Sequence, residues 1–533
     1  MHQLTTMKDG IKFITLKEAS NWASQYLNRS VTLSNISYLL QYGRINKYGN
    51  NGNPSINIDE LKSYYDDYDK EKQWKKILGE DLNWHLSFVE FKESERTKHV
   101  HRLHPYKGKF IPQLVEYFLD THTDEFKKNS YFQKEDIVLD PFCGSGTALV
   151  QANELGLHGI GIDVSAFNTL VCNAKIEKHN INQLREIVHQ ITLNLENFQK
   201  TKNNIVFEEH LLTELAKFNY KHFPSPDYKR KARTGEINEK EYAKDKENEF
   251  RDVYYNLIEK YNIKIKQDQN DGFLDKWFLS SVREEIDYVF EEIKKIKDKE
   301  IKKILAIILS RTVRSCRATT HADLGTLKEP VITTYYCKKH GKICKPIFSI
   351  KGWWQRYSID TINRLKEFDK LRTETYQHCL TGDSRKIDIY EDLKNKNPQF
   401  AELLLKQKIK GIFSSPPYVG LIDYHEQHAY AYEIFGFERK DELEIGPLSK
   451  GQGEKARESY IKGISEVLIN CKKYLQEDYD IFLVANDKFN LYPKIALLSD
   501  MKIINQFKRP VLNRVEKDRD NTYTETIFHL KKG

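Results

Sequence analysis

Long apolar runs and regularly spaced cysteines are both missing from this chain of 533 residues. Its longest apolar stretch, residues 304–309, is far shorter than the ~20 residues that a membrane-spanning helix needs. The seven cysteines follow no regular spacing and no signal segment is present, which argues against a secreted, disulfide-stabilised protein. The net charge of +8 permits a polyanionic partner without requiring one. We therefore expect a soluble protein of a reducing cytoplasm, with no membrane partner.

Proline is scarce, and Pro416-Pro417 is the only Pro-Pro pair among 14 prolines. Neither proline can donate to a sheet ladder and each fixes its φ, so an apolar strand at residues 411–413 must end in a rigid loop. This loop, Ser415-Pro416-Pro417-Tyr418, presents a hydroxyl, backbone carbonyls and an aromatic ring. Those groups suit a planar ring that carries an exocyclic amine, although an ordinary turn is the alternative.

A second motif combines a strand, a glycine-rich turn and a helix. The buried strand 136–140 precedes a turn with Gly144 and Gly146, and residues 148–155 have a helical pattern. Such glycines let the backbone approach a nucleotide closely, while the lack of a following lysine argues against a phosphate-binding P-loop. The next strand ends in Asp163, about 20 residues further on, where such folds place a ribose-binding carboxylate. The motif predicts an adenosine-type ligand.

The two motifs together resemble the paired signature of DNA amino-methyltransferases, which methylate cytosine N4 or adenine N6 with S-adenosylmethionine. Residues 97–112 resemble the family's segment that closes over the methionine part of the cofactor, and residues 379–385 resemble its third-strand segment near the adenine. The resemblance covers residues 97–174 and 378–533. It implies an α/β, Rossmann-like class I methyltransferase with a mixed seven-stranded sheet, from a bacterial or archaeal restriction–modification system with a separate cognate endonuclease.

The resemblance also implies roles for individual residues. The implied cofactor-binding set is Lys109, Phe110, Asp140, Pro141, Phe142, Gly144, Gly146, Thr147, Asp163, Asp383 and Ser415. The implied catalytic loop is Ser415, Pro416, Pro417 and Tyr418. In this interpretation the Ser415 hydroxyl and the Pro416 carbonyl accept hydrogen bonds from the two N–H groups of the amine, so that the lone pair of its nitrogen points at the methyl group. Tyr418 stacks on a base swung out of duplex DNA, and the transfer needs no metal.

Serine at the first position of the catalytic tetrapeptide goes, in the family, more often with cytosine N4 than with adenine N6. We therefore predict N4 methylation, with N6-adenine as the alternative. Methylation at cytosine C5 would need a thiolate, and we interpret Cys143 as a packing residue. An RNA or tRNA amine methyltransferase and a DNA-binding regulator with a vestigial core are further alternatives.

The remaining sequence predicts added modules around the core. We predict a module at 1–68 that resembles a winged helix-turn-helix, a cofactor-binding core part at 69–179, a mostly α-helical insertion at 180–377, and a catalytic core part at 378–533. The family resemblance implies that the insertion carries target recognition. In the first module, Thr15 and Glu18 form a capping box, Ser34 caps a second helix 35–42 closed by Gly43, and residues 44–47 and 55–58 form a hairpin wing. A small structural cap is the alternative, because the second helix carries no basic side chain.

The insertion contains two candidate DNA-binding groups and one candidate metal site. Lys229 and Arg230 lie in a basic run, and Arg311, Arg314 and Arg317 recur on a predicted helix; solvated charge is the alternative for the run. The spacing Cys337-x2-His340-x3-Cys344 could bind zinc if Cys316, His321 or Cys379 supplied a fourth ligand. Because paired Cys-x2-Cys units are missing, we predict a reduced hairpin without metal.

Overall fold

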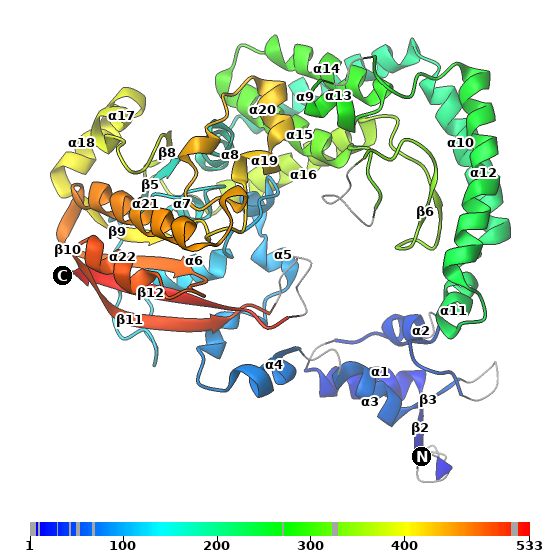
Figure 1. Cartoon of the computed structure of the whole chain (residues 1–533), viewed down its shortest axis with the longest axis horizontal. Coiled ribbons are helices and arrows are strands. Elements are labelled where there is room, and N and C mark those ends of the chain that lie inside the picture. Colours follow the sequence, from blue (N-terminus) through cyan, green and yellow to red (C-terminus); the bar gives the residue numbers. More distant parts are fainter. Residues whose placement is uncertain are drawn as a thin grey trace.

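The computed structural model describes residues 7–8, 11–28, 30–41, 44–48, 54–66, 70–268, 271–321, 329–512 and 521–533. Its centre is a seven-stranded sheet in the order β11-β12-β10-β9-β4-β5-β8 (Figure 1). The strands are β4 Ile137–Asp140, β5 His158–Asp163, β8 Gln377–Thr381, β9 Ile409–Ser414, β10 Leu475–Ala485, β11 Met501–Pro510 and β12 Thr524–Lys532. β12 pairs antiparallel with β10 and β11, whereas the other described pairings are parallel, so the sheet is mixed, as predicted.

Helices cover both faces of the sheet. Side chains alternate along each strand, so Leu139 and Ile412 face one apolar core whereas Val138 and Phe413 face the other. The first core includes α17 Ile389–Lys396, α18 Pro398–Gln407, α21 Glu454–Lys472 and α22 Tyr492–Leu498. The second includes α6 Pro112–Leu119, α7 Thr147–Glu154 and α8 Ala166–Ile176. Burial on both sides explains why the strands are continuous apolar runs.

The strand order reverses between β4 and β9, and this reversal places the two sequence motifs together. Val138 is opposite Gly411 and Leu139 is opposite Ile412 in a parallel pairing. A Cβ atom on Gly411 would lie 2.1 Å from the backbone oxygen of Asp480 in β10, so this strand requires glycine there. Open α/β sheets bind ligands at such a reversal, outside the carboxyl ends of the strands. The glycine turn and the proline loop both begin at this edge.

The insertion is mostly helical, as predicted, and it rests on the sheet. Its elements are α9 Ile181–Lys200, α10 Asn204–His222, α11 Asp227–Thr234, α12 Glu239–Tyr261, α13 Phe273–Trp277, α14 Ser280–Lys294, α15 Lys299–Ser315, β6 Tyr335–Cys337, β7 Lys342–Cys344 and α16 Lys351–Asp369. Apolar side chains of α15 and α16 belong to the same core as α7 and α8. The long helices α10 and α12 form an arm that leads from this core towards α11 and the N-terminal helices (Figure 1). The domain boundaries stay predictions.

The N-terminal module contains β1 Met7–Lys8, β2 Ile11–Thr15, α1 Leu16–Tyr26, α2 Leu33–Gln41, β3 Ser55–Asn57 and α3 Ile58–Asp66. The Thr15–Glu18 capping box is confirmed. The predicted cap at Ser34 is wrong, because α2 begins earlier and Thr32 exchanges hydrogen bonds with Asn35.

The predicted hairpin wing is confirmed only in part. Tyr48 forms an antiparallel bridge with Ser55, but within the described part of the chain residues 44–47 form no strand, and residues 55–57 pair with β2. Gly43 lies outside the described residues, and the winged helix-turn-helix stays a prediction.

Shorter elements complete the chain: α4 Lys70–Leu78, η1 Trp84–Ser87, α5 Glu93–Arg96, η2 His99–Arg102, α19 Tyr424–Gln427, α20 Ala429–Phe435, η3 Asp441–Leu443 and η4 Leu448–Lys450. Within the described part of the chain, none of the helices has the length and apolarity that crossing a membrane requires.

Candidate active site

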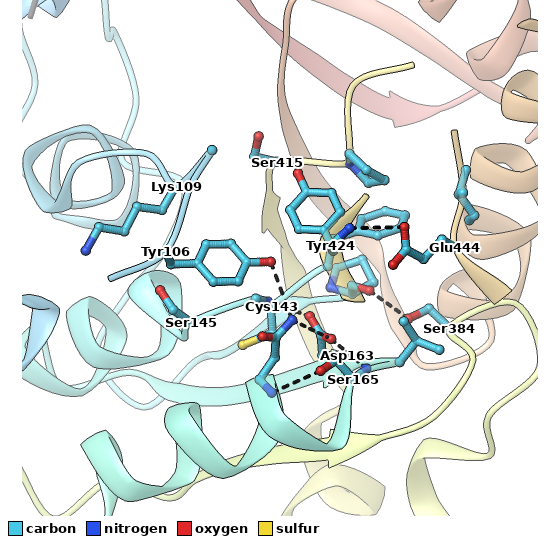
Figure 2. Close-up of a pocket in the computed structure, with 18 of the residues that line it drawn as sticks. Tyr106, Lys109, Cys143, Ser145, Asp163, Ser165, Ser384, Ser415, Tyr424 and Glu444 are labelled. Carbon is cyan, nitrogen blue, oxygen red and sulfur yellow. Dashed lines mark hydrogen bonds between the residues drawn. The ribbon is translucent and has the colours of Figure 1, made fainter. Parts of the chain in front are cut away.

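A pocket opens at the carboxyl ends of β4, β5, β8 and β9 (Figure 2). Its empty space is about 880 Å³ with the open mouth included, which is within the usual size of small-molecule sites. The lining comes from the glycine turn, the end of β5 and the start of α8, residues 382–384, the proline loop, α19, and residues 106, 108–110 and 443–445. Nine of the predicted cofactor residues line it: Lys109, Phe110, Pro141, Phe142, Gly144, Thr147, Asp163, Asp383 and Ser415. Asp140 and Gly146 are absent from the lining and support the wall.

The glycine turn depends on the backbone freedom of glycine. Gly144 and Gly146 have φ values of 50° and 80°, which disfavour any side chain. A Cβ atom on Gly146 would lie 2.4 Å from Sγ and 3.3 Å from Cα of buried Cys172 in α8. The turn therefore packs directly on α8.

Asp163, at the end of β5, holds this turn from the other side. Its Oδ2 accepts a hydrogen bond from the backbone N–H of Gly144 at 2.8 Å, and its Oδ1 accepts from the N–H of Ser165 at 2.8 Å. Burial raises the pKa of Asp163 to about 6. With one donor on Oδ2, this oxygen keeps capacity for another donor from the pocket.

Asp140 connects the glycine motif to the strand of the proline loop. Its Oδ1 accepts from Ser414 Oγ at 2.5 Å, although the two residues are 274 positions apart, and from Phe142 N–H at 3.2 Å. Burial raises the pKa of Asp140 to about 7. This bond fixes the start of the catalytic tetrapeptide relative to the glycine turn.

Among the described residues, three polar atoms of the pocket lining lack hydrogen-bond partners. They are Ser145 Oγ, Asp383 Oδ2 and His425 Nε2, all buried, although Asp383 Oδ1 accepts from Arg385 Nε at 2.8 Å. Buried polar atoms rarely remain unpaired, so these atoms indicate a polar ligand. The carboxylates of Asp163 and Asp383 suit hydroxyl and amine donors of an adenosine. The site therefore fits S-adenosylmethionine.

Lys109 lines the pocket without directing its charge into it. Its Nζ donates to the backbone oxygen of His101 at 2.6 Å, and the side chain extends away from Asp163 in Figure 2. Burial lowers the pKa of Lys109 to about 8. Only its stem and backbone are placed to contact a ligand.

The proline loop has two acceptors that the described residues leave available, the Ser415 hydroxyl and the Pro416 carbonyl. Ser415 Oγ donates to the backbone oxygen of Val484 at 3.1 Å, which leaves the lone pairs of the hydroxyl available. Among the described residues no donor binds the Pro416 carbonyl. Ser415 and Pro417 line the pocket, whereas Pro416 and Tyr418 do not. The Tyr418 hydroxyl instead donates to Glu525 Oε1 at 2.9 Å, in β12.

Several lining residues were not predicted individually. Tyr106 lies in the segment expected to close over the cofactor, and its ring stacks on Tyr424 at a centroid distance of 5.9 Å. Glu444 is buried and accepts from the N–H groups of Tyr424 and His425 at 3.2 and 2.8 Å, so it positions α19 (Figure 2). Glu444 belongs to no motif, and nothing in the neighbouring sequence indicates that it supports the pocket.

The three predicted DNA-binding arginines of the insertion have different surroundings. Arg311 is buried; it binds Asp360 at 2.5 Å and Thr361 at 2.9 Å, so it packs α15 against α16. Arg317 lies over the rings of Phe273 and Trp277. Arg314 is half-buried and has no hydrogen bond or ion pair with the described residues. α15, which carries Arg314, packs against α20. Burial, and next the charge of Arg314, lower the pKa of His428 at the start of α20 to about 3.

The two residues named from the basic run of the insertion bind other residues of the protein. Lys229 Nζ donates to the backbone oxygen of Lys339 at 2.6 Å, and Arg230 pairs with Asp227 at 2.9 Å and Glu236 at 3.2 Å. These contacts attach α11 to neighbouring segments of the insertion.

Comparison with known proteins gives consistent matches. The N6_N4_Mtase family model, described as DNA methylase, matches residues 7–170. The type II methyltransferase M.MjaII of Methanocaldococcus jannaschii is 47% identical over 527 residues, which cover 98% of this chain and 97% of the relative. M.BsoBI of Geobacillus stearothermophilus is 21% identical over 411 residues, covering 76% of this chain and 66% of the relative. M.MvaI of Kocuria varians is 34% identical over 118 residues, or 21% of this chain and 23% of the relative.

M.MjaII matches nearly the whole of this chain. The structure has the mixed sheet that the family resemblance implied, and both motifs line one pocket at its edge. Members of this family use S-adenosylmethionine as the methyl donor, and the lining of the pocket suits it. The chain therefore belongs to the DNA amino-methyltransferases of type II restriction–modification systems.

Proposed function

We propose that this protein methylates N4 of a cytosine that is extruded from duplex DNA at a specific sequence, and that a separate endonuclease reads the same sequence. The observation that carries the proposal is the position of Ser415, whose oriented hydroxyl lines the same pocket as Asp163. Serine at this place favours cytosine by resemblance to the family, and adenine N6 is the alternative.

The chemistry follows from the acceptors of the proline loop. An aromatic amine is a poor nucleophile because its lone pair is delocalised into the ring. Ser415 Oγ and the Pro416 carbonyl accept hydrogen bonds from the two N–H groups of the amine. They thereby direct its lone pair towards the cofactor side of the pocket. S-adenosylmethionine supplies an electrophilic methyl group on a sulfonium. No acid or base on the chain has to generate the nucleophile before transfer, and the proton that the methylated amine then loses passes to solvent.

Tyr418 forms the stacking surface for the extruded base. The ring is anchored through its hydroxyl, which donates to Glu525. Glu525 also contacts Arg509 Nε at 3.3 Å. Stacking and pairing in the pocket offset the few kcal/mol that extrusion costs.

We expect Tyr418→Ala to lower kcat/KM far more than Tyr418→Phe, because phenylalanine keeps the stacking ring and loses only the anchor to Glu525. The anchor is a single hydrogen bond to a charged group, so its loss costs about 1.5–3 kcal/mol at most. Steady-state kinetics with a duplex substrate measure both effects. Equal losses in the two variants would contradict stacking as the role of the ring.

Asp163 binds the ribose in this proposal, and its pKa gives cofactor binding a pH dependence. The carboxylate accepts hydroxyl donors best when ionised, so binding favours the charged form. Since the free protein holds this pKa at about 6, affinity is full above that pH and falls as the pH decreases through it. Linkage predicts about a tenfold loss of affinity between pH 7 and pH 5.

Calorimetric titration with S-adenosylhomocysteine from pH 5 to pH 8 measures this dependence. Asp163→Asn should weaken binding and remove the step near pH 6, whereas Asp140→Asn should retain it. Constant affinity of the native protein over the whole range would exclude Asp163 as an ionised cofactor ligand.

For DNA, we propose contacts from Arg314 and from the N-terminal module. Arg314 has no hydrogen-bond or ion-pair partner among the described residues, and its helix α15 packs against α20, which follows the pocket-lining helix α19. The exposed side of α2 carries Ser34, Asn35 and Gln41, which can read bases only as neutral polar groups. Arg311 is not part of this proposal, because its charge is buried and paired.

Methyl transfer from tritiated cofactor tests the proposed reaction. The protein is incubated with duplex DNA or with tRNA, and each product is hydrolysed to nucleosides. We expect label in N4-methylcytosine from duplex DNA alone. Label in N6-methyladenine would show that adenine is the methylated base and that the protein is still a DNA amino-methyltransferase. Label in tRNA would contradict the proposal.

A further inference from the structure

The hairpin of β6 and β7 carries a cluster of metal-ligating side chains far from the pocket in sequence. Tyr335 is opposite Cys344 and Cys337 is opposite Lys342, so the two cysteines project from the same face of the hairpin. Both thiols are free and buried, at 1% and 8% exposure. His340 lies in the turn between them, and its Nδ1 is 3.4 Å from Cys344 Sγ.

A fourth side chain reaches this cluster from outside the hairpin. Single ligand atoms of His321, Cys337, His340 and Cys344 all lie within 4.8 Å of one another. The rings of His321 and His340 have a centroid distance of 4.5 Å. Of the three residues that the sequence offered as a fourth ligand, His321 is thus the one that joins the hairpin; Cys379 belongs to another cluster of the described residues.

We propose that His321, Cys337, His340 and Cys344 bind a structural zinc ion. Two thiolates and two imidazoles are a standard tetrahedral zinc set, and ligand bonds of about 2.0–2.3 Å need only a small contraction of the present cluster. Binding releases one proton from each thiol, and the two thiolates balance the charge of the cation. The four ligands leave no open position, so the ion has no role in methyl transfer.

The surroundings of the cluster support a closed structural site. The Tyr335 hydroxyl is 2.9 Å from His321 Nδ1, so this partner orients the ring and leaves Nε2 for the metal. Apolar packing on this face of the hairpin is small, because the buried cluster contains only Tyr335, Cys337 and Cys344 among the described residues. A three-residue hairpin is marginal without further support. The ion would join the hairpin to the segment that follows α15.

Metal analysis of the purified full-length protein tests the site. We expect about one zinc per chain, and X-ray absorption at the zinc edge should fit two sulfur and two nitrogen neighbours. This measurement uses the native protein, so it does not depend on the folding of a variant. Absence of zinc after growth and titration with zinc, or a sulfur-only shell, would overturn the proposal.

Variants locate the metal. The double variant Cys337→Ser with Cys344→Ser should lose zinc and melt at a lower temperature, while Cys471→Ser, a buried cysteine of α21 outside every cluster of described ligands, should keep zinc. Cys379→Ser tests the cluster of Cys143, Cys172 and Cys379, and it should also keep zinc. Retention in the double variant, or loss in Cys379→Ser, would contradict the assignment.

Discussion

Replacing Ser415 with alanine should lower the rate of methyl transfer by about 10²–10³, which is the usual effect of removing one positioned polar group from a reacting centre. The hydroxyl is held by the Val484 carbonyl and has free lone pairs, so the variant loses an acceptor for the amine without losing packing. Single-turnover rates with a duplex substrate measure the loss. The dissociation constant of the cofactor should stay within about twofold, because the ribose-binding end of the pocket is unchanged.

Ser415→Thr is the matched control, because it keeps the hydroxyl and should recover part of the rate. Full activity of Ser415→Ala would remove the hydroxyl from the mechanism. Loss of cofactor binding together with the rate would mean that Ser415 supports the pocket and does not act on the amine.

Gly146→Ala should raise the dissociation constant of the cofactor about tenfold to a hundredfold, or roughly 1.4–2.8 kcal/mol. Its backbone is left-handed, and the new Cβ would meet the sulfur and the backbone of Cys172, which are buried and cannot withdraw. The turn must therefore move, and it carries Gly144 and Ser145 at the pocket wall.

Gly235→Ala provides the control for backbone strain. Gly235 has the same φ of 80° at the end of α11, but a Cβ atom there meets nothing within 4 Å. Both variants should lose about 1–2 kcal/mol of stability from the left-handed backbone, as chemical denaturation would show. Only Gly146→Ala should weaken the binding of the cofactor. Equal binding by the two variants would contradict the close packing of the glycine turn on α8.

The core of the fold was predictable from local sequence. Strand 136–140 and its helix appear as β4 and α7 within a residue of the expected ends, because apolar runs bounded by glycine leave little freedom. The sequence could also identify the two motifs separately. Their contact, through the pairing of β4 with β9 and the bond from Ser414 to Asp140, was implied by family resemblance and is confirmed by the sheet.

Long-range polar partners were not predictable. Glu444 supports α19, Glu525 anchors Tyr418, and His321 joins the cysteine hairpin, each across chain separations that no periodicity records. Arg311 shows the opposite error: a basic side chain at helical spacing looks available for DNA, yet Asp360 and Thr361 bind it inside the protein. Burial and pairing of charges depend on tertiary contacts, so a single sequence does not reveal them.

A crystal structure of the protein with S-adenosylhomocysteine and a target duplex tests the central claim most directly. We predict the ribose at Asp163, and an extruded cytosine with its amine at Ser415 Oγ and the Pro416 carbonyl and its ring on Tyr418. A cofactor bound elsewhere, or an unextruded base outside the proline loop, would contradict the account.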